Sequence, residues 1–242
     1  MLDRFLGGYV TASPTPPSQT SAQGVWELEQ QASAQVQNAW PLPPNVIQRS
    51  LRFNSADSAY LNRTPATASN RKTWTWSGWV KRASLGTNQG IFSCAGTSNT
   101  TYMLISFDNN DKLYVGNYSA AIIVSSAVYR DLSAWYHIVV ALDTTQGTAA
   151  NRLKVYVNGT EISYGTDSKS TYLTINSDQG INQAVAHSIG RETQGATYYF
   201  SGYMTEINFV DGQALTPSSF GETDAQTGVW VPKVYTGSYG TN

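Results

Sequence analysis

Two acidic residues, Glu206 and Asp211, stand close together in a segment that the sequence predicts to be a strand. Carboxylate pairs can hydrolyse a glycosidic bond when both groups flank it, about 5 to 5.5 Å apart in a retaining enzyme. Along a strand this needs an even spacing, because successive side chains point to opposite faces. Glu206 and Asp211 are five positions apart. The sequence therefore predicts that they face opposite ways and that the chain is not an enzyme.

Other reactive side chains are scattered. The two histidines, His137 and His187, fall in separate predicted strands and form no Ser/His/Asp arrangement. Asp108, Asn110 and Asp111 place oxygen atoms at a predicted hairpin tip. Such residues are ordinary turn formers and lack the full ligand set of a dedicated calcium loop, so a turn is favoured and calcium remains the alternative. We predict no catalytic residue, no cofactor and no dedicated metal site.

Tyrosines and neighbouring amides offer a different kind of chemistry. An exposed aromatic ring stacks on the apolar face of a pyranose, and amides bind its hydroxyl groups. The residues that could make such contacts are Tyr102, Asn110, Tyr114, Tyr118, Tyr198 and Tyr199. The alternative is that these tyrosines, among fifteen in the chain, serve the core, the sheet edges and subunit interfaces.

Composition excludes several classes of partner. The 15 basic and 16 acidic residues give a net charge of −1, so the basic surface of a nucleic-acid binder is missing. No run of 18 apolar residues is present to insert into a membrane. The first ten residues do not form a signal peptide, which predicts export by a route other than the usual secretory one. Cys94 is the single cysteine and is expected to be a buried strand residue.

The elements that must position these side chains are mostly strands. Residues 72–82 alternate, with Trp74, Trp76 and Val80 on one face and Trp79 on the other. Further alternating segments are followed by turn residues about every ten positions, including an Asn-Gly turn at 158–159. The strands expected after the first are 102–107, 112–118, 122–125, 135–143, 153–162, 171–175, 184–189 and 198–210. The fold class predicted is all-β, an antiparallel sandwich, preceded by an extended arm and one short α-helix.

The first 45 residues differ from the rest. Residues 1–23 are rich in Pro, Ser, Thr and Gln and predict an extended docking arm, while residues 24–45 predict a short amphipathic helix and a Pro-rich linker. The sandwich is expected over 46–222, and 223–242 reads as a linker to a further region. Apolar residues expected to dock on a neighbouring molecule are Leu2, Phe5, Leu6, Tyr9, Trp26, Leu28, Val36 and Trp40. A disordered terminus is the alternative for the arm.

The order of several motifs between residues 46 and 222 resembles the laminin-G-like group of concanavalin-A-type jelly rolls. The motifs are residues 74–81, Trp135-Tyr136-His137 with Asp143, 153–159, 188–191, 200–207 and Ala214-Leu215-Thr216. The resemblance implies the jelly-roll fold, in which these residues fill the core and form turns, and it carries little information on a ligand. The same fold is used by glycoside hydrolases, and the odd spacing of Glu206 and Asp211 speaks against that activity here.

A second resemblance concerns the flanking segments. Residues 24–28, 38–41, 220–222 and 228–233 are similar to segments of jelly-roll virion proteins of tailed bacteriophages, often tail-fibre or tail-associated proteins. This implies a structural protein of the virion, with other virion proteins as partners, a homo-oligomer such as a trimer, and display of the jelly roll for adhesion to host glycan. The alternatives are a carbohydrate-binding module that recognises host glycan and a capsid-decoration protein.

Overall fold

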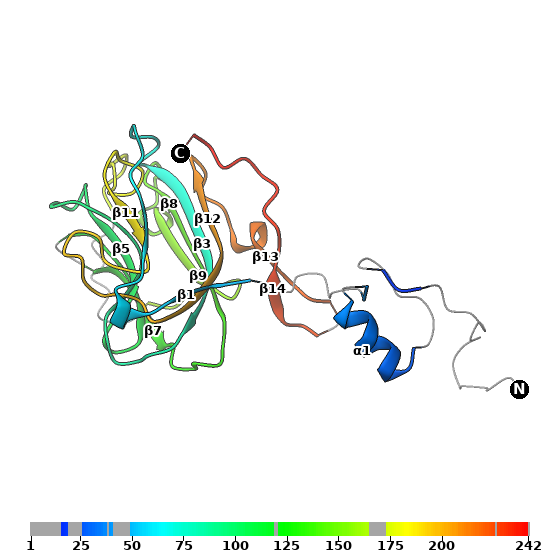
Figure 1. The fold of residues 1–242 in the computed structure, drawn as a ribbon. Helices are drawn as coiled ribbons and strands as arrows, with labels where there is room; N and C mark the ends of the chain where they lie inside the picture. Colours follow the sequence, from blue (N-terminus) through cyan, green and yellow to red (C-terminus); the bar gives the residue numbers. More distant parts are fainter. Residues whose placement is uncertain are drawn as a thin grey trace, which may run out of the picture. The chain divides into compact units, whose positions relative to one another are not determined.

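The computed structural model describes residues 16–18, 26–37, 39–40, 49–118, 121–164, 173–225 and 227–241. The chain divides into two units, one up to Val46 and one from Ile47 onward (Figure 1). In the described part of the first unit, helix α1 spans Leu28–Val36 and is shorter than the predicted segment. The backbone N–H of Glu27 donates to Oε1 of Gln30 at 3.0 Å, which begins the helix with half of a capping box.

The second unit is a sandwich of two antiparallel sheets (Figure 1). In sheet order, the described strands of the first are β1 (Leu51–Phe53), β12 (Gly202–Asp211), β3 (Thr73–Arg82), β8 (Tyr136–Asp143), β9 (Leu153–Val157) and β10 (Thr160–Glu161). Those of the second are β2 (Leu61–Arg63), β11 (His187–Ile189), β4 (Gln89–Cys94), β5 (Met103–Phe107), β6 (Lys112–Gly116) and β7 (Ala121–Val128). We call them the β3 sheet and the β5 sheet. The predicted fold class, an antiparallel β-sandwich with a short helix before it, is confirmed.

Shorter elements complete the described part of the second unit. Three 3₁₀ turns span Ser55–Asp57, Ala149–Asn151 and Pro217–Ser219, and a hairpin joins β13 (Gly221–Thr223) to β14 (Trp230–Pro232). The strand expected at 184–189 is reduced to β11, and the described residues of the segment 171–175 form no strand.

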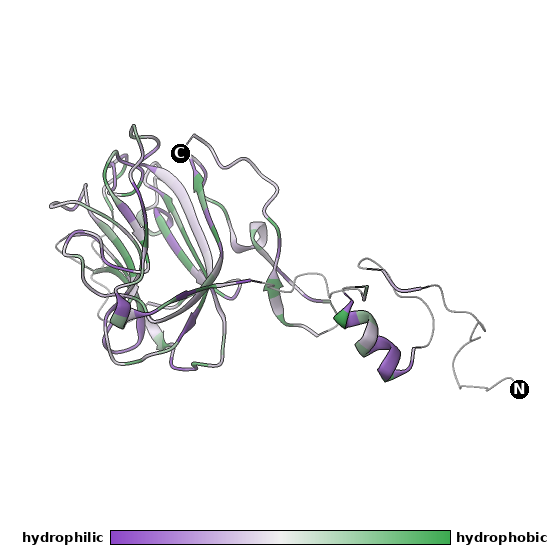
Figure 2. Ribbon diagram, viewed as in Figure 1, coloured by the Kyte–Doolittle hydropathy of each residue, from purple (hydrophilic) through white to green (hydrophobic). Residues whose placement is uncertain are grey.

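The core lies between the sheets and follows the alternation of β3. Trp74, Trp76 and Val80 are fully buried there, as the period of two predicts. They meet side chains of the β5 sheet such as Ile105 and Val115, which are also fully buried. Hydrophobic residues recur along the strands of both sheets (Figure 2). Cys94 is buried in this core, and burial raises the pKa of its thiol to about 12.

The outer face of the β3 sheet carries a second layer of packing. Trp79 lies on this face and its ring stacks on His137 at 4.9 Å between centroids. Trp230 of β14 stacks on the same imidazole at 6.0 Å, and its indole N–H donates to Nδ1 of His137 at 2.9 Å. The described residues around Trp230, within the segment 223–242 predicted to be a linker, therefore pack on the sheet. An aromatic side chain and a β-hairpin hold them against the sheet.

A buried ion pair links the turn between β5 and β6 to the end of β3. Arg82 is 1% exposed and donates to Oδ1 of Asp111 at 2.9 Å, while Arg130 donates to Oδ2 at 2.9 Å. Burial alone would raise the pKa of Asp111, but hydrogen bonds from Gly86, Arg130 and Arg82 outweigh it and hold the pKa below its ordinary value. The guanidinium of Arg82 also lies over the ring of Phe107, 4.4 Å from its centroid.

Removing the charge of Asp111 is expected to destabilise the sandwich strongly. Asp111→Asn leaves the cation of Arg82 buried without its counter-ion, which should lower the free energy of unfolding by about 3 to 5 kcal/mol. Arg130→Gln is the control, because that arginine contacts the same carboxylate from an exposed position and should cost less than about 1 kcal/mol. Urea unfolding followed by tryptophan fluorescence measures both. Similar losses of unfolding free energy in the two variants would contradict the role of Asp111 as the counter-ion of the buried Arg82.

Candidate functional site

An open groove lies on the outer face of the β5 sheet. Its volume is about 580 Å³, and its lining combines tyrosines, amides and hydroxyls. Five of the six side chains singled out in the sequence line it together: Tyr102, Asn110, Tyr114, Tyr118 and Tyr198. They come from separate stretches of the chain that only the fold brings to one place.

The floor of the groove is built by the pleat of β5, β6 and β7. Leu104 and Ser106 point to the groove, because their neighbours along β5 fill the core. Tyr114 pairs with Ser106 on one side and with Val124 on the other. Its ring lies against Gly116, where an added Cβ would come within 2.5 Å of the ring. The glycine thus leaves the space in which the tyrosine lies along the sheet.

A loop between β11 and β12 forms one wall. It crosses β4 at Gly90, where a Cβ would lie 2.6 Å from the backbone nitrogen of Glu192. Ser93 fastens it, since its hydroxyl donates to the carbonyl of Arg191 at 3.0 Å and accepts from the N–H of Thr193 at 2.9 Å. These contacts fix the loop on the sheet and direct its tip toward the groove.

Glu192 shapes the tip of this loop. The side chain is 5% exposed, and its carboxylate accepts the N–H groups of Gln194 at 2.8 Å and Gly195 at 2.7 Å. It also raises the pKa of Tyr102, an effect that adds to the larger one of burial, so this phenol stays protonated. Tyr198 adopts a left-handed backbone with φ of 53°, a conformation uncommon for a bulky residue. Such local strain is typical of binding loops.

A second turn and a pair of rings line the groove at the two ends of the β5–β6 hairpin. Asp108 accepts the N–H groups of Asn110 at 2.9 Å and of Lys112 at 2.8 Å through one carboxylate oxygen. Tyr102 and Tyr118 meet edge to face at 6.1 Å, with 81° between their planes. Tyr118 is 54% exposed, so its ring also presents apolar surface to solvent.

The electrostatics of the groove are mildly acidic. Asp108 and Glu192 are the charged side chains among its described lining residues, and the remaining polar ones are neutral. Asn117 Oδ1 is buried there without a hydrogen-bond partner in the described part of the chain. The arrangement can hold a neutral molecule with apolar faces and many hydroxyl groups.

A family comparison agrees with the fold. Residues 54–219 match the laminin-G-type family of the concanavalin A-like lectin/glucanases superfamily. The chain belongs to this superfamily. None of the curated protein sequences matches the chain.

Two solved structures share the superfamily fold with this chain. Domain 4 of AbnA, a GH43 extracellular arabinanase from Geobacillus stearothermophilus, in complex with arabinotriose, is 18% identical with a TM-score of 0.51, over 85% of this chain and 84% of that one. A carbohydrate binding protein from Bacteroides ovatus, so described provisionally, is 16% identical with a TM-score of 0.50, over 74% of this chain and 47% of that one. At these identities the likeness concerns the fold.

Tyr199 is the sugar-contact candidate that lies outside the described lining of the groove. Its ring tilts against Tyr60 at 6.3 Å, and the guanidinium of Arg191 covers Tyr60 at 3.5 Å. Tyr198 lines the groove while its neighbour Tyr199 contacts Tyr60, and the chain turns between them at the left-handed backbone of Tyr198, whose φ is 53°. The sequence reasoning also missed Glu192, Gln194 and Thr197 of the wall. In the sequence these residues belong to a polar cluster that is typical of a turn after a strand. Such a cluster does not reveal where the loop packs.

The acidic pair on β12 is separated by an irregularity that the sequence did not predict. The register shifts between Thr205 and Asn208, and Glu206 has φ of 49°, so strict alternation fails there. Glu206 is exposed. Asp211 is buried and accepts hydrogen bonds from Ser69, Asn182 and Thr241. Burial would raise the pKa of Asp211, but these bonds hold it below its ordinary value.

The hairpin-tip oxygens do not converge on one point. Both oxygens of Asp111 are engaged by Arg82 and Arg130, while Asp108 holds the turn. The described residues contain no group of three or more His, Cys, Asp or Glu side chains placed to hold a metal ion. None of the described helices is long and apolar enough to cross a bilayer.

Of the expected docking residues, Leu2, Phe5, Leu6 and Tyr9 lie outside the described residues. Trp26 and Trp40 contact each other edge to face at 5.6 Å. On α1, Leu28 and Val36 are 83% and 85% exposed. These two apolar side chains of the described helix are therefore largely exposed.

Both histidines have their two ring nitrogens engaged within the described structure. His187 has both ring nitrogens engaged, Nδ1 with the carbonyl of Val185 at 2.8 Å and Nε2 with the N–H of Asn182 at 3.1 Å. His137 is likewise engaged, with Nε2 at 2.9 Å from the hydroxyl of Ser77 and Nδ1 accepting from Trp230. Burial lowers the pKa of His137 to about 4.

The burial of His137 predicts a loss of stability in mild acid. Its pKa falls from 6.5 to about 4 on folding, so between these values the unfolded chain binds a proton that the folded chain excludes. The contribution of the neutral His137 to the free energy of unfolding is complete above pH 6.5 and declines as pH falls toward 4. The total decline is about 3 kcal/mol. Urea unfolding between pH 7 and pH 4 measures the slope. The pKa of His187 is also lowered by burial, so His137→Gln should reduce the slope by the share of His137, and an unchanged slope in that variant would contradict the assignment.

Proposed function

We propose that this chain is a carbohydrate-binding module and that the groove on the β5 sheet is its binding site. The observation that carries the proposal is the gathering of Tyr102, Tyr114, Tyr118 and Tyr198 with amide side chains in one open groove of about 580 Å³. The superfamily, named for lectins and glucanases, supports it. So do the two similar structures, whose names refer to carbohydrate binding and to arabinotriose.

Recognition would combine ring stacking with hydrogen bonds. Tyr118 and Tyr198, which are 54% and 44% exposed, would cover the C–H faces of sugar rings. Asn110 and Gln194 are exposed lining residues that can donate to and accept from hydroxyl groups. A groove open along the sheet suits internal units of a glycan chain as well as its end.

The charges favour a neutral glycan. Asp108 and Glu192 would repel carboxylate or sulfate groups of an acidic sugar. Within the described lining, no lysine or arginine compensates for them. The same two carboxylates hold backbone N–H groups of their own turns, so they serve to shape the groove. We therefore propose binding without hydrolysis.

Exposed tyrosines of the groove are expected to control the affinity. Tyr118→Ala removes a stacking surface and should weaken binding of a neutral oligosaccharide about 10-fold, or about 1.4 kcal/mol. Tyr199→Ala is the matched control, because this tyrosine lies outside the groove and should leave binding unchanged. Titration calorimetry with a panel of neutral oligosaccharides that includes arabinotriose makes the measurement.

The outcomes of that titration separate the alternatives. An acidic oligosaccharide such as a trigalacturonate should bind more weakly than the neutral panel. Absence of saturable binding by every neutral sugar would contradict the proposed function. Equal losses in Tyr118→Ala and Tyr199→Ala would contradict the proposed site. Release of reducing sugar on prolonged incubation would contradict binding without hydrolysis.

A second proposal concerns the context in which the module works. We infer from the sequence motifs at residues 24–28, 38–41 and 228–233 that it is part of a tailed-phage virion, as a tail-fibre or tail-associated protein and a homo-oligomer such as a trimer. The observation that favours an anchoring role is the exposure of Leu28 and Val36 on α1. Apolar side chains uncovered on a helix gain free energy when a neighbouring protein buries them. A capsid-decoration protein would share this anchor.

Anchoring predicts that the N-terminal segment is needed for assembly and not for folding of the sandwich. Deletion of residues 1–23 should leave the melting temperature of the sandwich unchanged and prevent incorporation into particles. Leu28→Glu should reduce incorporation in the full chain, whereas Gln35→Glu on the same helix is the control. Full incorporation of the truncated chain, measured by immunoblot of purified particles, would contradict the proposal.

A further inference from the structure

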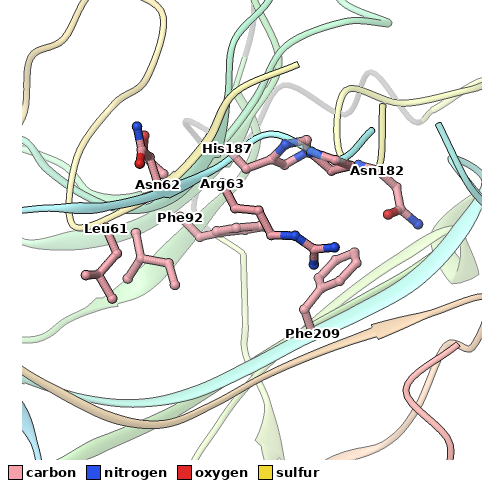
Figure 3. A pocket seen from close by; sticks show the side chains of 10 residues that line it. Leu61, Asn62, Arg63, Phe92, Asn182, His187 and Phe209 are labelled. Atoms are coloured by element: carbon pink, nitrogen blue, oxygen red, sulfur yellow. The ribbon is translucent and has the colours of Figure 1, made fainter. Parts of the chain in front are cut away.

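A second cavity opens between the two sheets, away from the groove. Its volume is about 190 Å³, and its walls come from β2, β4 and β11 of one sheet and from β12 of the other. Phe92 and Phe209 line it from facing sheets, and Leu61 and Ile189 add aliphatic surface (Figure 3). Neither the superfamily fold nor the proposed glycan site assigns a role to this space.

Its size and lining suit a single apolar ring. An apolar protein cavity of about 150 Å³ is known to remain dry and to bind benzene. The present one is slightly larger and is lined by two aromatic rings, which favour stacked or edge contacts with a third. Leu61 is 47% exposed although its strand partner Ile189 packs against the core. The inward side of β2 is thus incompletely covered, which leaves an entrance.

Arg63 supplies a charge at this cavity. It shares the inward face of β2 with Leu61, and its side chain extends toward Phe209 across the gap between the sheets (Figure 3). Within the described residues the exposed side chain of Arg63 makes no hydrogen bond, ion pair or ring contact, whereas the side chains of Arg82, Arg130, Arg152 and Arg191 each have a partner. The nearby carboxylate of Asp211 is already satisfied by Ser69, Asn182 and Thr241.

Three other polar side chains of the cavity, those of His187, Asn182 and Ser188, are engaged within the protein, and the exposed Asn62 is the remaining one. His187 uses both ring nitrogens within the protein, and Asn182 donates to the carbonyl of Asn70 at 2.9 Å and to Asp211. A ligand that enters would therefore find apolar walls and one free cation. From this combination we propose that the cavity binds a small carboxylate with a flat apolar body, with its ring against the neighbouring rings of Phe92 and Phe209, whose centroids are 6.0 Å apart, and its carboxylate on Arg63.

Phenylacetate and its neutral isostere phenylacetamide are the probes for this proposal. Phenylacetate should bind in the millimolar range, about 1 mM, with saturable NMR shifts of the aromatic resonances of Phe92 and Phe209. The amide should bind about five-fold more weakly, because it keeps the ring contacts and loses a partly exposed ion pair. Arg63→Gln should remove this preference while binding of the ring persists.

Controls separate the cavity from non-specific association. Arg52→Gln changes an exposed strand arginine of the β3 sheet and should leave the five-fold preference intact. Leu61→Phe should fill the entrance and abolish binding of both probes, with an unchanged melting temperature as evidence of folding. Absence of saturable shifts at about 10 mM, equal affinities for the two probes, or full binding in Leu61→Phe would each overturn the proposal. None of these results depends on the glycan site.

Discussion

Strand β3 is buried on both of its faces, and the rest of the structure is arranged to satisfy this constraint. Trp74, Trp76 and Val80 require an apolar layer on one side, which the β5 sheet supplies. Trp79 requires one on the other side, which His137 and Trp230 supply. A strand that carries tryptophans on both faces gains burial free energy from two layers at once. The second sheet and the C-terminal hairpin are consequences of that sequence.

The covering of the outer face of the β3 sheet also explains why the groove lies on the β5 sheet. The outer face of the β3 sheet is covered in part by the hairpin β13 and β14, and the outer face of the β5 sheet is left open over β5, β6 and β7. There the alternation that buries Ile105 and Val115 presents Ser106 and Tyr114 to the outside. The loop with Glu192 adds a wall because Gly90 lets its backbone lie directly on the sheet. Core packing and groove lining are thus two faces of one pleated surface.

Sequence reasoning succeeded where a regular period decides the answer. The faces of Trp74, Trp76 and Trp79 follow from a period of two, and the antiparallel sandwich follows from short alternating segments with turns between them. It did not foresee that the described residues around Trp230 pack on the sheet, because a segment rich in Gly, Ser and Thr resembles a linker unless its single tryptophan finds a partner far away in the chain. It also missed the bulge at Glu206, since one extra residue in a strand leaves no mark on composition.

The sequence by itself determined the fold class, the buried faces of the central strands and the types of residue able to meet a sugar, because local periodicity and side-chain chemistry are properties of short segments. Only the tertiary structure decided that Tyr102, Tyr114 and Tyr198 share one groove while Tyr199 turns away to Tyr60. It alone also decided that Arg63 meets an apolar cavity between the sheets. The physical reason is that these neighbourhoods depend on strand order and on the path of one loop over Gly90, which are set by packing between residues about a hundred positions apart.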